Sequence, residues 1–458
     1  MAQPSVSDLM FTVRRRQPEL ITPAKSTPHE FKLLSDIDDQ DGLRCRIPAA
    51  FFYPYEQSMQ GKDPAQLIRK ALAQALVFYY PLAGRLREGP GRKLMVDCNE
   101  EGVVFIEADA DVTIHQFGDP IQPPFPCFEE LLYNVPGLEG IINCPPLVVQ
   151  VTRLKCGGFV LAYFFNHTMW DGHGIAQFFG ALAEIARSAS EPSVTPVWCR
   201  ELLNARDPPR VTCTHHEYTE VPDDTEAKMP EAMVQSSFFF GPDKLKAIRQ
   251  LFSEYHGQYT VFEAFTAFLW RCRTISLQLE PDQEIRLMCI SNVRGKTNPP
   301  LLPIGYYGNG FVYPAAVTTA NKLTRSPLVY ALELVKKAKG EATVEYIRSV
   351  ADLMVIRGRP CFNPVRSWIV SNLTRSGLRD IDFGWGKAIY AGPAMAGAGS
   401  FPGVSFFVAC KNAKGEEGIT ALLCLPRKSM EIFAREIDNM LSSHNDNVRD
   451  SKFIMSCL

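Results

Sequence analysis

A histidine and an aspartate four positions apart are the side chains of this sequence with the clearest chemical potential. His167 follows an apolar run at 159–165, which predicts a buried strand, and Asp171 is followed by Gly172 and Gly174. A neutral imidazole, with an unperturbed pKa of roughly 6.5, can take a proton near neutral pH and return it later. A positioned base contributes about 10²–10⁴-fold to a rate. His167 is therefore the candidate general base.

The spacing leaves the role of Asp171 open. Its carboxylate could orient the imidazole of His167, or the turn could direct it away, where it would hold the loop through a cation elsewhere. A histidine at the end of a strand can also be merely hydrogen-bonded in place, and the pattern His-x-x-x-Asp is short and common. The catalytic and the structural interpretation both stay open on spacing alone.

Length and composition limit the classes of protein to consider. A chain of 458 residues exceeds one typical core, so we expect two domains. The 46% hydrophobic and 21% charged residues are typical of a soluble globular protein, and the net charge of −2 gives no reason to expect a nucleic-acid or membrane partner. No apolar run reaches the roughly 18 residues of a membrane span, and the N-terminus lacks a hydrophobic signal core.

The 13 cysteines predict neither a metal site nor a disulfide framework. They contain no Cys-x-x-Cys pair, so free thiols in a reducing compartment are expected. The last three residues, Ser456-Cys457-Leu458, loosely resemble a peroxisomal Ser-Lys-Leu ending, although the middle lysine is missing. We therefore expect the cytosol or the peroxisome as the compartment.

Alternating strands and helices should position the two candidate residues. Asp63-Pro64 has the form of a helix start, with Asp as the N-cap and Pro at the first helical position. The runs at 147–154 and 159–165 predict a strand pair that ends at His167, and a helix should begin near Gly174. The runs at 94–96 and 103–107 also predict paired strands.

A polar, acidic, proline-containing stretch at 207–231 predicts a linker between an N-terminal domain at 1–206 and a C-terminal domain at 232–458. It contains His215-His216, whose side chains would point to different sides of an extended chain, so a shared metal is not expected. The second half again alternates, with expected strands at 285–290, 367–371, 406–410 and 419–424 and expected helices at 262–269, 328–339, 344–355 and 430–441. Both halves therefore predict mixed α/β domains.

A second landmark lies far downstream, at Asp382-Phe383-Gly384-Trp385-Gly386. Together with His167, Asp171 and Gly172 it resembles the plant BAHD acyltransferase family, whose marks are HxxxDG and DFGWG. The stretches at 34–40, 79–86 and 305–309 are similar to the alcohol acyltransferase branch of that family, and the resemblance runs nearly end to end. It implies a chloramphenicol acetyltransferase-like fold: two α/β sandwich domains of similar topology with the active site in a channel between them.

The resemblance also implies a reaction. His167 would deprotonate an acceptor hydroxyl as its oxygen attacks the thioester carbonyl of an acyl-CoA, and the thiol of coenzyme A would leave. This chemistry needs no covalent enzyme intermediate, no metal and no permanently bound cofactor. The partners implied are small-molecule acyl-CoA and alcohol substrates, with no nucleic acid and no membrane, and the family is generally monomeric.

Roles for further residues follow from the resemblance. Asp171 is expected to pair with Arg294 and hold the His167 loop, with Gly172 as part of the same support. In the downstream motif, Gly384, Trp385 and Gly386 are expected to build a tight turn. Asp382 would anchor that turn and is also the second catalytic candidate.

Two further positions are expected to contact the cofactor, and Trp170 has two possible locations. Ser371 and Thr374 match positions at which the family contacts coenzyme A. Trp170 stands where relatives often carry a small residue, so its ring could border the acceptor pocket or could simply pack into the core.

We expect benzoyl-CoA and benzyl alcohol as the substrates and benzyl benzoate as the product. The alternatives are a broad-specificity alcohol acyltransferase making short-chain, anthraniloyl or methyl esters, and an amide-forming N-acyltransferase of the same family. A binding protein without catalysis is a further alternative, against which the intact His167 argues.

Overall fold

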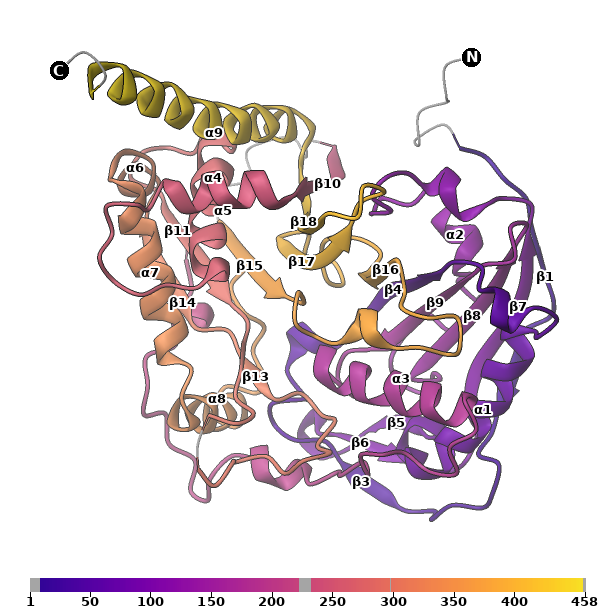
Figure 1. Ribbon diagram of the computed structural model, residues 1–458. Coiled ribbons are helices and arrows are strands. Elements are labelled where there is room, and N and C mark those ends of the chain that lie inside the picture. Colours follow the sequence, from indigo (N-terminus) through magenta and orange to yellow (C-terminus); the bar gives the residue numbers. More distant parts are fainter. Residues whose placement is uncertain (1–8, 222–231, 297, 456–458) are drawn as a thin grey trace.

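Two mixed sheets, formed mainly by opposite halves of the chain, lie side by side in the computed structural model (Figure 1). It describes residues 9–221, 232–296 and 298–455, and the side chains up to residue 442. Each sheet combines parallel and antiparallel pairs and carries helices on a face. The expected pair of mixed α/β domains is thereby confirmed.

The first sheet holds the strand that ends at His167. Within the described residues it has seven strands in the order β1-β7-β8-β9-β4-β16, with β2 also paired to β7. The strands are β1 (Val13–Arg15), β2 (Glu19–Ile21), β4 (Arg46–Tyr53), β7 (Val103–Ala110), β8 (Leu147–Leu154), β9 (Phe159–Asn166) and β16 (Tyr390–Pro393). The predicted antiparallel pairing of 147–154 with 159–165 is confirmed by β8 and β9.

Two helices cover one face of this sheet, α1 (Pro64–Phe78) and α3 (Gly172–Ala186), and they pack against each other. Helix α1 begins as predicted, because the side chain of Asp63 accepts a hydrogen bond from the N–H of Ala65 and Pro64 occupies the first helical position. Apolar residues of both helices share one core with β4, β8 and β9. The shared core thus positions β9 and α3, the two elements on either side of His167.

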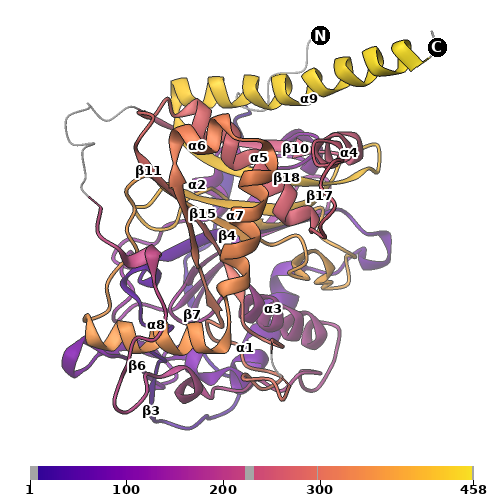
Figure 2. The same ribbon diagram turned by 90° about the vertical axis from the view of Figure 1, so that its left-hand side faces the viewer.

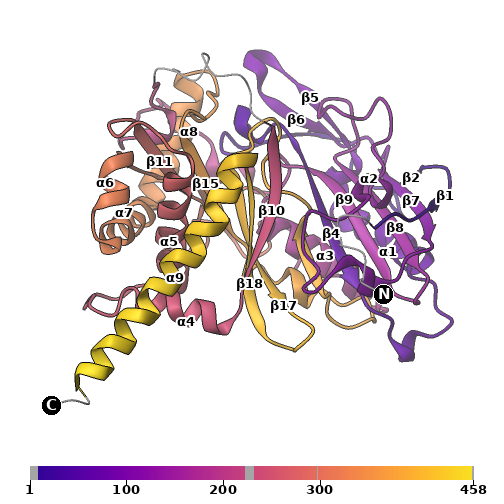
Figure 3. The same cartoon turned by 90° about the horizontal axis from the view of Figure 1, so that it is seen from above.

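The second sheet has the strand order β10-β18-β17-β15-β11-β14 among the described residues. Its strands are β10 (Met233–Phe240), β11 (Glu284–Cys289), β14 (Ala315–Thr319), β15 (Ser367–Asn372), β17 (Val404–Lys411) and β18 (Glu417–Pro426). Its helices are α4 (Pro242–Gln250), α5 (Val261–Ser276), α6 (Ala320–Arg325), α7 (Leu328–Glu341) and α9 (Arg427–Met455). Helix α5 packs between α7 and α9; α6 and α7 stand in front of the strands in Figure 2, and α9 projects past the body in Figure 3.

One strand crosses from the second half of the chain into the first sheet. β16 pairs antiparallel with β4, so that Tyr390 lies opposite Phe52 and Pro393 opposite Ala49. The boundaries 1–206, 207–231 and 232–458 stay a prediction. The crossing of β16 means that residues after 232 also belong to the first sheet.

The predicted pairing of 94–96 with 103–107 is wrong. β6 (Leu94–Asp97) pairs instead with β3 (Phe31–Leu33) and β5 (Arg85–Glu88) in a separate sheet, whereas β7 pairs with β1, β2 and β8. The intervening turn has positive φ at Glu100 and Gly102, 59° and 88°, and it carries the chain from one sheet to the other. Only glycine fits at 102, because a Cβ there would lie 2.3 Å from the carbonyl oxygen of Ile21.

The described part of the predicted linker, 207–221, is bound to α8 (Val344–Ile356). The main-chain N–H groups of Thr212 and Cys213 donate to Oγ of Ser349 at 2.9 and 3.0 Å, and His215 Nε2 lies 2.8 Å from the same oxygen. The remaining short elements are α2 (Phe128–Leu131), β12 (Ser291–Asn292) and β13 (Phe311–Val312).

Several expectations concern features outside these elements. The cysteines that the structure describes are free. None of the helices in the described residues combines the length and apolar character that crossing a membrane requires. The tripeptide Ser456-Cys457-Leu458 lies outside the described residues, as does the linker segment 222–231.

Candidate active site

His167 directly follows β9 and faces a cavity. Tyr163 and Phe165 share one face of β9, and His167, the first residue after the strand, lines the same cavity. The ring of Phe165 lies 5.7 Å from the imidazole, and Phe311 of the second half approaches it from the other side at 6.0 Å. The main-chain N–H of His167 donates to the carbonyl of Cys45 at 3.0 Å. The histidine is thus held where the two halves of the chain meet.

The cavity encloses about 840 Å³ of empty space, including the part that opens to solvent. Both halves line it, and most of the lining side chains are aliphatic or aromatic, among them Leu43, Ile47, Ala49, Phe165, Ile175, Ile290, Phe311, Phe362, Ile369, Leu373 and Phe406. His167 supplies the imidazole in this apolar surface. Such a site suits an apolar small molecule whose proton must be removed.

The ring of His167 is suited to accept that proton. Burial lowers its pKa; the main-chain carbonyl of His167 itself, the carboxylates of Asp171 and Asp38 and the amide of Asn309 act against this shift without reversing it. The imidazole is therefore neutral at neutral pH. Its Nδ1 atom is buried and makes no hydrogen bond to the described residues, so a molecule in the cavity cannot reach the ring through this nitrogen.

Asp171 is fully engaged by groups other than the imidazole of His167. As the N-cap of α3, its Oδ1 accepts from the N–H groups of His173 and Gly174 at 3.0 and 2.9 Å. Its Oδ2 accepts from the N–H of Gly310 at 2.9 Å and from Arg294 at 2.7 Å. The structure thus contains the ion pair that the resemblance implied.

The environment keeps the carboxylate of Asp171 ionised. Burial alone would raise its pKa, but the charge of Arg294 and the hydrogen bonds from Arg294, Gly310 and Gly174 hold that pKa below its usual value. Gly172, the first residue of α3, borders the cavity. The ion pair therefore joins the start of α3 to the second half of the chain, one turn beyond His167.

The downstream motif forms a separate turn. Asp382 Oδ1 accepts from the N–H groups of Gly384 and Gly386 at 2.7 and 2.8 Å, and Gly384 has a φ of 109°. The ring of Trp385 packs against Phe159 at 5.2 Å. Asp382 is not among the residues lining the cavity, so the structure does not bring it together with His167. Its catalytic assignment stays a prediction.

The other predicted site residues divide between the cavity and its surroundings. Ser371, near the end of β15, lines the cavity, whereas Thr374 does not and instead donates its hydroxyl to Asn372 at 2.7 Å. Trp170 is fully buried and packs against Phe178 at 5.0 Å in the core below the first sheet. Of the two locations considered for Trp170, the acceptor pocket and the core, the structure shows the core. Trp170 does not line this cavity.

A residue that the sequence analysis did not single out touches the His167 turn. Asn309 Nδ2 donates to the main-chain carbonyl of His167 at 2.8 Å. The sequence feature that could have pointed to Asn309 was the stretch 305–309, which was used only as a mark of the alcohol acyltransferase branch. Among the side chains that the structure describes, no group of three or more His, Cys, Asp or Glu could hold a metal ion.

Comparison with known proteins identifies the family. The model of the Transferase family matches residues 11–440. Benzyl alcohol O-benzoyltransferase of Nicotiana tabacum is 60% identical over 437 residues, which cover 95% of each chain. The protein is a BAHD acyltransferase. Another BAHD relative, 13-hydroxylupanine O-tigloyltransferase of Lupinus albus, is 55% identical over 446 residues, covering 96% of this chain and 97% of its own.

Solved structures agree with the BAHD fold. Vinorine synthase superposes with a TM-score of 0.71 at 22% identity, covering 92% of this chain and 96% of its own. TRI101 of F. sporotrichioides, in complex with coenzyme A and T-2, has a TM-score of 0.69 at 17% identity, covering 87% and 96%. At these identities the likeness concerns the fold.

Proposed function

We propose that this enzyme transfers the benzoyl group of benzoyl-CoA to benzyl alcohol and forms benzyl benzoate. The proposal rests on the apolar cavity that contains His167, together with 60% identity to benzyl alcohol O-benzoyltransferase of Nicotiana tabacum. An aromatic acyl group and an aromatic alcohol both match a lining rich in Phe and aliphatic residues.

In the proposed reaction His167 acts as general base and then as general acid. Nε2 takes the hydroxyl proton of the alcohol while the alcohol oxygen forms its bond to the thioester carbonyl. When the carbon–sulfur bond breaks, the same proton passes to the thiolate of coenzyme A. Because burial favours the neutral imidazole, the ring is ready for the first of these steps without prior deprotonation.

The acyl donor is proposed to reach His167 along the second half of the chain. A structural neighbour, TRI101, was solved with coenzyme A. Ser371 lines the cavity from β15, and we propose that its hydroxyl contacts a thioester that reaches into the cavity. Thr374 lies beyond the strand end, and we place it at the outer part of the donor path.

The experiment is release of free coenzyme A from benzoyl-CoA with benzyl alcohol. We expect wild type to release it and His167→Ala to lose about 10²–10⁴-fold in kcat. His173→Ala is the matched control, because this neighbouring histidine does not line the cavity, and it should retain most of the activity. Equal activity of His167→Ala and wild type would contradict the mechanism.

Two further measurements separate the alternatives. Intact-mass analysis after incubation with benzoyl-CoA alone should show an unmodified chain, because the acyl group passes directly to the acceptor; a benzoyl adduct would contradict this. Turnover with acetyl-CoA and aliphatic alcohols but none with benzoyl-CoA would favour the alternative, an alcohol acyltransferase that makes short-chain esters.

A further inference from the structure

Two buried side chains hold the main-chain carbonyls of the turn that carries His167. Asn309 Nδ2 donates to the carbonyl of His167 at 2.8 Å and lies 3.4 Å from that of Thr168. Arg200 Nη2 donates to the carbonyl of Met169 at 2.6 Å. Asn309 is 0% and Arg200 1% exposed, so neither contact competes with solvent. Three consecutive carbonyls are thus fixed from outside the turn.

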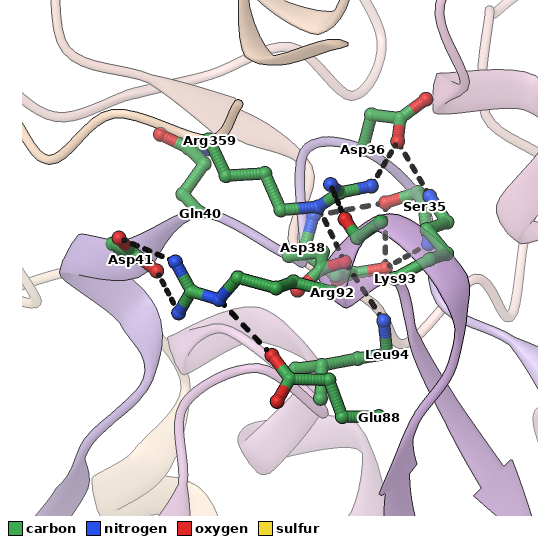
Figure 4. Close-up of polar contacts among 12 residues, drawn as sticks. Ser35, Asp36, Asp38, Gln40, Asp41, Glu88, Arg92, Lys93, Leu94 and Arg359 are labelled. Carbon is green, nitrogen blue, oxygen red and sulfur yellow. Dashed lines mark hydrogen bonds and ion pairs between the residues drawn. The ribbon is translucent and has the colours of Figure 1, made fainter. Parts of the chain in front are cut away.

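A single carboxylate organises both of these side chains. Asp38 Oδ1 accepts from Arg200 Nη1 at 2.7 Å, and from the main-chain N–H and the Nδ2 of Asn309 at 2.9 and 2.8 Å. Its Oδ2 accepts from the N–H and the hydroxyl of Ser35 at 3.1 and 2.6 Å (Figure 4). Asp38 is itself 0% exposed. Its carboxylate therefore sets the position of both donors to the turn.

The loop that carries Asn309 is tightly confined. A Cβ at Gly308 would lie 1.9 Å from Arg200 Nη1, and a Cβ at Gly310 would lie 2.8 Å from Arg294 Nη1. The N–H of Gly310, the residue after Asn309, donates to Asp171. Two ion pairs, the buried Asp38–Arg200 and the partly buried Asp171–Arg294, thus lie on either side of the loop, and both contact the His167 segment.

We propose that Asp38 is a positioning residue for His167, acting through Arg200 and Asn309 to fix the carbonyls of residues 167–169 and with them the direction in which the imidazole enters the cavity. The inference rests on the proposed function, because it presupposes that His167 transfers the proton. Positioning errors of about 1 Å cost on the order of 10²-fold in rate, so a device that fixes the turn is functionally significant.

The same loop offers a matched control. Asp36 is 5% exposed and forms ion pairs with Lys93 at 2.5 Å and Arg359 at 3.6 Å, as Figure 4 shows. It also accepts from the N–H of Ala205 at 2.8 Å. Asp36→Asn and Asp38→Asn therefore remove the same charge from the same buried loop. The groups paired with Asp36 are Lys93, Arg359 and the N–H of Ala205, and none of them donates to the carbonyls of the turn.

The test compares kcat, KM for benzoyl-CoA and melting temperature of the two variants. We expect both to melt below wild type, and only Asp38→Asn to lose about 10- to 100-fold in kcat at a nearly unchanged KM. The charges facing His167 are the carboxylates of Asp171 and Asp38, which are paired with Arg294 and Arg200. Removing one negative charge should therefore shift the acidic limb of kcat/KM to lower pH in Asp38→Asn, and not in Asp36→Asn.

A second variant removes no charge. Asn309→Ala leaves the Asp38–Arg200 pair intact but deletes the donor to the His167 carbonyl, so we expect a similar fall in kcat with a smaller change in melting temperature. If Asp38→Asn does not fold, the kcat of Asn309→Ala tests the inference by itself. Wild-type kcat in Asn309→Ala, or equal kcat in Asp38→Asn and Asp36→Asn, would overturn the inference. Failure of wild type to use any acyl-CoA would instead overturn the proposed function.

Discussion

At the level of single residues, the site separates a neutral histidine from charged supports. His167 is neutral because burial lowers its pKa, whereas Asp171 is ionised because Arg294 and main-chain N–H groups hold its pKa down. The sequence made His167 the candidate general base, which stays a prediction. The family resemblance implied the Asp171–Arg294 pair, which the structure contains. The sequence could not predict the contact from Asn309 to His167, because 142 positions separate the two residues and only the folded chain brings them together.

Asp171→Asn tests the structural role of the ion pair. Asparagine preserves the N-cap of α3 but removes the negative charge opposite Arg294, which is 13% exposed, so the free energy of unfolding should fall by about 3–5 kcal/mol. Asp171→Ala should lose about 1 kcal/mol more, because it also removes the cap. Chemical denaturation measures both, and an unchanged midpoint in Asp171→Asn would count against the role.

The contribution of Asp171 to stability depends on pH. The folded pKa of Asp171 lies below its unfolded value of about 3.9, so its contribution is fully present above that value and is lost as the pH falls through the folded pKa. Wild type should therefore lose stability below about pH 4 more steeply than Asp171→Asn.

At the level of elements, the alternation of strands and helices was predictable. Which strands pair with each other was less predictable. Periodicity located β8, β9, α1 and α3 and gave the β8–β9 hairpin, because its two strands are joined by a short turn. It wrongly paired β6 with β7, although these two strands are about as close along the chain. The turn between them, with positive φ at Glu100 and Gly102, packs against the main chain of Ile21, and no local pattern encodes this contact.

Asp382→Ala distinguishes a turn anchor from a catalytic acid or base. The carboxylate satisfies two main-chain N–H groups of its own turn, so its removal should cost about 1–3 kcal/mol of stability. The kcat of the folded variant should stay close to that of wild type. Loss of kcat at an unchanged melting temperature would make Asp382 catalytic. Activity normalised to folded protein, measured by circular dichroism, separates the two.

At the level of the whole molecule, the cavity belongs to neither half alone. Ile47 and Phe165 come from the first half, whereas Phe311 and Ile369 come from the second, and His167 lies between them. The sequence predicted two domains with a channel between them only through the family resemblance. Chain length and the linker predicted two domains, but they contain no information about which faces meet.

The pairing of β16 with β4 means that this enzyme should behave as a split protein. In the intact chain β16 covers the edge of β4, whose residues Ala49 to Phe52 are fully or nearly fully buried. A fragment of residues 1–221 would expose that apolar edge, so it should be insoluble when expressed alone. Co-expression with residues 232–458 should restore a soluble, active complex from two unlinked pieces. A soluble monomeric fragment of residues 1–221 would contradict this expectation, whereas reconstitution would make the sheet, rather than the linker, the connection that holds the catalytic cavity together.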